Sequence, residues 1–160
     1  MILFIILITS CSTTQYPMAK VENKAFGELY NEVRKALGQK NVYELDSSMF
    51  IYDTFEIKSV KHYKNGYYYI GAKKNDDIFP ILSFENIINN DTTRESKIIQ
   101  EGDVCVLQLM PLFDEDRLPG SEMVYIIYVN HFTEVQISRA FMLSLNVYMS
   151  PDVIGKKYYE

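Results

Sequence analysis

The chain has 160 residues, of which 48% are hydrophobic and 23% charged, and its formal net charge is −5. This balance is that of a globular chain that buries a core, which argues against a disordered protein. An acidic surface without a cluster of Lys and Arg repels phosphate backbones, so we expect no nucleic-acid partner.

The chain begins with an apolar run, Ile2 to Ile8, which is followed shortly by Cys11. A run of this length, at about 1.5 Å per residue, cannot cross a hydrocarbon core roughly 30 Å thick. Its length is that of the apolar region of a secretory signal peptide. No Lys or Arg precedes the run, so the amino terminus supplies the only positive charge there.

The residues Ile8-Thr9-Ser10-Cys11 resemble a bacterial lipobox, in which an aliphatic and two small residues precede a cysteine. The resemblance implies a lipoprotein whose signal peptide, residues 1–10, is removed and whose Cys11 is acylated. Residues 11–18 would then tether the domain to the membrane, and several acyl chains anchor a protein stably. Two other interpretations stay open: a cleaved signal without a lipid, or an N-terminal core strand that carries a structural cysteine.

Residues 19–160 suffice for a single domain. Between residues 19 and 37 the apolar positions recur every four residues, which predicts an amphipathic helix. These positions are Val21, Ala25, Leu29 and Val33. Gly38 suits the residue after the helix, and Arg34 and Lys35 suit the negative end of its dipole.

From Val42 onward β-branched and aromatic residues alternate with polar ones, which predicts strands. The dipeptide Asn65-Gly66 predicts a two-residue hairpin turn, because both residues tolerate positive φ. The expected partners across this turn are Tyr63 with Tyr68, His62 with Tyr69, and Lys61 with Ile70.

Alternation in the two hairpin strands separates a core face from an outward face. The expected core face holds Phe55, Ile57, Tyr63, Tyr68, Ile70 and Ala72. On the outward face, His62, Tyr67 and Tyr69 form an amphipathic patch, which we name as the candidate binding surface. The alternative is that the helix or a second layer covers this face and makes the tyrosines core residues.

Further strands are predicted at Phe79 to Phe84, Val104 to Phe113 and Met123 to Val135. The run from Val124 to Val129 is apolar on both faces and indicates a central strand. Alternation favours a strand over a helix at Ala140 to Met149. Together these elements predict an α+β fold, in which the N-terminal helix packs on a mainly antiparallel sheet.

The chain lacks the common catalytic and metal-binding motifs. Its two histidines, His62 and His131, do not have the spacing that places two imidazoles on one metal. The acidic loop at residues 114–122 fails the spacing of a calcium-binding EF-hand loop. We therefore expect no catalytic residue, no metal site and no cofactor. The alternative is a small envelope hydrolase that uses His62 or His131 with a carboxylate.

Cys105 lies in an apolar strand and is expected to be a small buried residue. If Cys11 carries no lipid, a disulfide between Cys11 and Cys105 becomes possible in an oxidising compartment. The triplet Asp91-Thr92-Thr93 resembles the acceptor for periplasmic O-glycosylation in some Bacteroidetes, with an ordinary polar loop as the default.

The sequence thus predicts a lipid-anchored protein of the bacterial cell envelope, facing the periplasm or the cell surface. Its domain is expected to be a non-catalytic binding or structural module. The expected partners are the membrane, through the lipid anchor, and an envelope protein.

Overall fold

The computed structural model describes residues 24–39, 47–64, 66–85, 95–113, 124–129, 133–138 and 146–159. The helices are the α-helix α1 (Lys24–Ala36) and the 3-10 helix η1 (Ser47–Met49). The strands are β1 (Ile51–Tyr63), β2 (Tyr67–Lys74), β3 (Asp77–Phe84), β4 (Ser96–Ile98), β5 (Val104–Pro111), β6 (Val124–Val129), β7 (Thr133–Ser138), β8 (Tyr148–Met149), β9 (Val153–Ile154) and β10 (Lys157–Tyr159).

Several predictions made from the sequence fall on residues outside these ranges. They concern the signal peptide, Cys11 and its tether, the triplet Asp91-Thr92-Thr93, the loop at 114–122, and His131. The predicted strand at 140–149 is described only from residue 146, where β8 forms its end.

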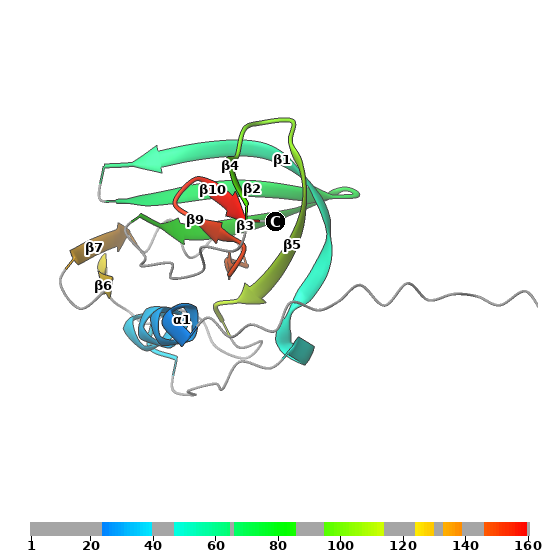
Figure 1. Cartoon of the computed structure of the whole chain (residues 1–160). Coiled ribbons are helices and arrows are strands. Elements are labelled where there is room, and N and C mark those ends of the chain that lie inside the picture. Colours follow the sequence, from blue (N-terminus) through cyan, green and yellow to red (C-terminus); the bar gives the residue numbers. More distant parts are fainter. Residues whose placement is uncertain are drawn as a thin grey trace, which may run out of the picture.

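Five strands form a closed barrel in the order β1-β2-β3-β8-β5. Neighbouring strands are antiparallel, except that β3 and β8 run parallel where Ile81 lies beside Tyr148. Figure 1 shows β1 bending across the top and down one side of the barrel. Its first half, Ile51 to Glu56, pairs with β5, and its second half, from Glu56 to Tyr63, pairs with β2. One long strand therefore serves two neighbours and lets the sheet close.

The predicted α+β fold, with an N-terminal helix packed on a sheet, is wrong. The described part of the chain is mostly strand, its main sheet closes into a barrel, and α1 is a single short helix. The apolar run Val124–Val129 is not a central strand, because β6 forms a separate two-stranded sheet with β7. Strand periodicity shows which faces are buried, but it does not show whether a sheet closes on itself.

Two clusters of apolar side chains make up the core. The cluster inside the barrel comprises Phe55, Ile57, Ile70, Ala72, Ile81, Ile99, Cys105, Leu107, Leu109, Val153 and Tyr158. The cluster on the outer face of the barrel comprises Phe26, Leu29, Tyr30, Val33, Leu37, Tyr67, Leu82, Phe84, Met110, Leu112, Val135, Ile137, Val147 and Met149. The apolar stripe of α1 and the inward side of β7 thus cover one outer face of the barrel.

Polar contacts fix α1 to the end of β5. The Tyr30 hydroxyl donates to the carbonyl of Pro111 at 2.6 Å, and Arg34 Nη1 donates to the carbonyl of Leu112 at 3.1 Å. Gly38, at φ 78°, ends the helix with an N–H donated to Lys35. The sequence predicted this helix end, and the structure confirms it.

The β1–β2 hairpin differs from the prediction by one residue. Tyr63 pairs with Tyr67 and His62 with Tyr68, because the loop between the strands is one residue longer than the predicted turn. In this loop Gly66, at φ 83°, donates its N–H to Tyr63 at 3.1 Å. A positive φ of this kind suits glycine, so the sequence located the turn correctly and missed only its length.

A bulge between Ile57 and Ser59 also changes which side chains of β1 face inward. Gly71 lies opposite the bulge, and a Cβ there would come within 2.7 Å of Ser59 Oγ. Beyond the bulge His62 shares the inner face with Tyr68, while Tyr63 shares the outer face with Tyr67. The inward positions of Phe55, Ile57, Ile70 and Ala72 are confirmed by their complete burial.

The C-terminal segment, residues 146–159, bridges β3 and β5. On the β3 side, the Gly155 N–H donates to Phe84 at 2.9 Å and Ser83 Oγ donates to Val153 at 3.1 Å. On the β5 side, the Asp152 carboxylate accepts bonds from the Gln108 main-chain N–H at 2.8 Å and Nε2 at 3.2 Å. The short strand β8 is thereby extended by main-chain and side-chain hydrogen bonds that hold the barrel closed.

Truncation of Tyr67 tests whether this ring belongs to the core. We expect Tyr67→Ala to lower the free energy of unfolding by about 3–5 kcal/mol, as for other large buried aromatic side chains. Tyr52→Ala is the matched control, because Tyr52 is 39% exposed and Tyr67 only 4%. Urea denaturation of both variants measures the difference, and equal losses would contradict the burial of Tyr67.

Candidate functional site

The structure separates the three residues of the predicted binding surface. Tyr67 is buried in the outer core cluster and stacks on Tyr63, with ring centroids 4.8 Å apart. Tyr69 is half-buried, and burial raises the pKa of both the Tyr67 and the Tyr69 hydroxyl. His62 is exposed on the other face of the hairpin. For Tyr67 the alternative given by the sequence, a covered ring, therefore holds.

His62 belongs instead to a cluster with Tyr68 and Glu85. Its Nε2 lies 3.2 Å from Glu85 Oε1, and its ring stacks on Tyr68 with centroids 4.6 Å apart. Burial is the larger cause that raises the pKa of the Tyr68 hydroxyl, and a hydrogen bond to Glu85 is the second. The His62–Glu85 pair can exchange a proton, although half of the His62 side chain is exposed. The sequence missed Glu85 because it follows β3 and is distant from His62 along the chain.

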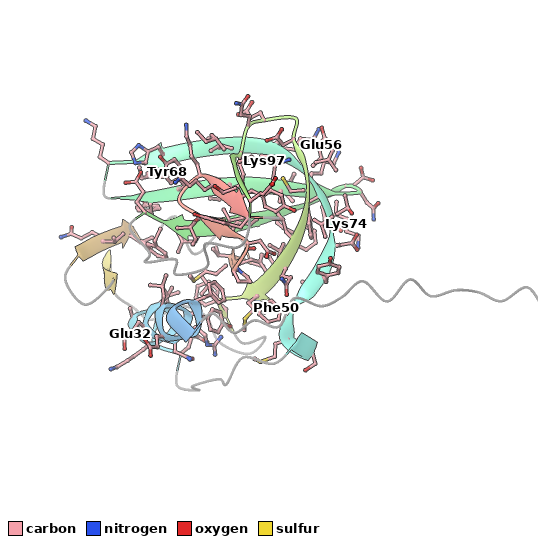
Figure 2. All side chains as sticks on the ribbon, viewed as in Figure 1. Glu32, Phe50, Glu56, Tyr68, Lys74 and Lys97 are labelled. Atoms are coloured by element: carbon pink, nitrogen blue, oxygen red, sulfur yellow. The ribbon has the colours of Figure 1, made fainter. Side chains whose placement is uncertain are left out.

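A pocket of about 370 Å³ lies at the other end of β2. Figure 2 shows this separation, with Tyr68 at one end of the strand and Lys74 and Glu56 at the other. The pocket is lined by Asp53, Thr54, Phe55, Glu56, Lys73, Lys74, Asn75 and Val104. None of these residues was predicted as a site residue.

The pocket arises because β1 leaves β2 in order to join β5. The last β1–β2 pair is Glu56 with Lys73, after which β2 turns into β3 through Asn75 at φ 56°. The preceding residues of β1 pair with β5, so the two strands diverge. Side chains from the diverging strands line the space between them. No single segment of sequence signals this arrangement.

Two ion pairs organise the charges around the pocket. Lys74 donates to the Asp53 carboxylate across the gap between the strands, and Lys58 pairs with Glu56. The hydrogen bond from Lys74 and a second bond from the Thr54 N–H lower the pKa of Asp53. Lys73, which is half-buried, forms no ion pair with the other described residues.

Exposed apolar side chains flank these charges on the outer face of the barrel. A row of cross-strand neighbours runs over β5, β1, β2 and β3 as Val104, Glu56, Lys73 and Ile78. At the two ends of the row, Val104 is 62% exposed and Ile78 is 45% exposed. Tyr52 and Val106, also partly exposed, lie on the neighbouring part of β1 and β5. This region combines apolar and charged groups, as recognition surfaces do.

The remaining candidate groups can be placed only in part. Cys105 is buried inside the barrel, as the sequence predicted. Among the described residues, no three His, Cys, Asp or Glu side chains are arranged to hold a metal ion. Within the same ranges, no helix is both long and apolar enough to span a membrane.

Comparisons with protein-family models, with curated proteins and with solved structures found no match to this chain.

The Asp53–Lys74 pair yields a test of the electrostatics of the pocket. We expect Lys74→Met to raise the pKa of Asp53, because the variant removes the hydrogen bond that stabilises the carboxylate. A lowered pKa in the folded state means that the pair stabilises the fold at neutral pH. This stabilisation is lost as the pH falls through the folded-state pKa of Asp53.

Carbon-13 NMR titration of the Asp53 carboxyl group measures this pKa directly. Lys58→Met is the control, since Lys58 pairs with Glu56 and should leave the Asp53 titration unchanged. An Asp53 titration that is the same in Lys74→Met and in the unmodified chain would show that the pair does not form in solution.

Proposed function

We infer that this chain is a lipid-anchored protein of the bacterial cell envelope whose barrel binds a partner protein. The observation that carries the anchoring is the sequence Ile8-Thr9-Ser10-Cys11 at the end of a short apolar run. Acyl chains on Cys11 would hold the domain at the membrane, facing the periplasm or the cell surface.

The binding role is supported by what the barrel buries and what it exposes. Its interior is filled by large side chains, among them the fully buried Phe55, Leu107 and Ile81. Its outer face carries Val104 and Val106 on one strand next to Tyr52 on another, all at least 38% exposed. Exposed aliphatic and aromatic groups beside charged ones suit contact with another protein.

A second candidate function is a small envelope hydrolase, and the pair His62–Glu85 is the observation that favours it. A histidine 3.2 Å from a carboxylate has the geometry of a general base and the group that orients it. The pair does not line the described pocket, which lies at the opposite end of β2. We therefore prefer the binding role.

Substitution of Cys11 tests the anchoring. We expect the unmodified chain to incorporate radiolabelled palmitate and to sediment with membranes. Cys11→Ala should lose both properties, because the acylated sulfur is gone. Cys105→Ala is the matched control and should keep both, since Cys105 is buried. An unmodified chain that stays soluble and unlabelled would refute the lipoprotein proposal.

A further inference from the structure

The pocket between β1 and the end of β2 contains a cation that the surrounding carboxylates do not neutralise. Lys74 is held by Asp53, and Glu56, the cross-strand neighbour of Lys73, pairs with Lys58. Among the described residues this leaves the ammonium group of Lys73 available to a bound anion. Because Lys73 is half-buried, an anion bound there would be partly shielded from water.

Other groups in the pocket extend this site in two ways. The Thr54 hydroxyl and the Asn75 amide can donate hydrogen bonds to an oxyanion. Val104, 62% exposed, provides apolar surface beside them. The lining therefore suits a ligand that carries both a negative group and a small apolar group.

The negative charges of the pocket restrict the kind of anion. The carboxylates of Asp53 and Glu56 share the lining with Lys73, and they would repel a doubly charged phosphate more strongly than a carboxylate. At about 370 Å³ the volume lies near the small end of ligand pockets. The pocket is thus suited to a singly charged carboxylate with a short apolar side chain.

The backbone around the pocket favours the end of a peptide over a free acid. Residues Ile51 to Phe55, which precede Glu56 in β1, pair with β5 but not with β2, so an edge of this strand borders the pocket. An extended peptide can lie along such an edge while its terminal carboxylate is held by a cation.

We propose that the β1–β2 pocket binds the C-terminal carboxylate of an extended peptide. The carboxylate pairs with Lys73, and the last apolar side chain of the peptide packs against Val104. This inference rests on the proposed binding role, and it specifies which feature of a partner protein the barrel recognises.

The test is an NMR titration of the full chain with the peptide N-acetyl-Ala-Val-Val as the free acid and as the C-terminal amide. The free acid should shift the amide signals of Thr54, Asn75 and Val104. The amidated peptide should bind roughly ten- to a hundredfold more weakly, as expected for the loss of a charge-assisted hydrogen bond. Isovalerate, a small apolar carboxylate, should bind more weakly than the free acid because it cannot pair with the strand edge.

Variants separate the role of Lys73 from general electrostatics. Lys73→Met should weaken binding of the free acid by at least about tenfold, and Lys73→Arg should retain it. Lys61→Met removes the same charge from an exposed position on β1 and should bind as the unmodified chain does. A spectrum of Lys73→Met that matches the unmodified chain outside the pocket confirms that this variant is folded.

The inference would be overturned by no shifts with the free acid, by equal binding of acid and amide, or by unchanged binding to Lys73→Met. Isovalerate binding as tightly as the peptide would also overturn it, in favour of a site for small acids. These outcomes are independent of palmitate labelling at Cys11. Failure of this titration in a chain that is labelled would therefore leave the lipid anchor intact.

Discussion

The barrel depends on a buried carboxylate that joins its last strand region to β5. Asp152 is 2% exposed and accepts two hydrogen bonds from Gln108, one from the main chain and one from the side chain. These bonds continue the contact that β8, with only two residues, begins. On the opposite side, two hydrogen bonds join the same segment to β3. Ser83 Oγ donates to the Val153 carbonyl, and the Gly155 N–H donates to the Phe84 carbonyl. A carboxylate thus does what a longer strand would do in a more regular barrel.

This closure determines where the pocket lies. Because β5 is held against the C-terminal segment on one edge, β1 must cross from β2 to β5 to complete the barrel. The crossing separates β1 from the end of β2, and Lys74 bridges the gap to Asp53. The pocket and its unneutralised Lys73 therefore follow from barrel geometry and not from a dedicated loop. The proposed binding site is in this sense a consequence of the fold.

The sequence predicted local features well because these depend on short-range patterns. Of the predicted stripe, Leu29 and Val33 are buried in α1, Gly38 ends that helix, and Gly66 has the positive φ expected near Asn65. The inward positions of Phe55, Ile57, Ile70 and Ala72 followed from alternation. The bulge near Ser59 could not be predicted, because it is matched to Gly71 on another strand. It places His62 beside Tyr68 and so changes which residues form the hairpin surface.

Barrel closure and both candidate sites were missed for a related reason. Asp152 with Gln108, Glu85 with His62, and Lys74 with Asp53 each join residues far apart in the sequence. Nothing in the local pattern of either partner indicates the other. As an apolar residue in a strand, Val104 would be assigned to the core from the sequence pattern. In the structure it is exposed and faces outward, whereas its neighbour Cys105 is buried.

Hydrogen exchange in Asp152→Ala tests most directly whether the C-terminal segment closes the barrel. The variant leaves the buried Gln108 N–H without its carboxylate acceptor, which costs about 1–3 kcal/mol. If closure is cooperative, amides of β3, β5 and residues 146–159 should all exchange roughly ten- to a hundredfold faster. Asp103→Ala, at an exposed turn where Asp103 accepts a bond from Gln100, should leave these rates unchanged. Faster exchange confined to Gln108, with β3 and the C-terminal segment still protected, would contradict this account.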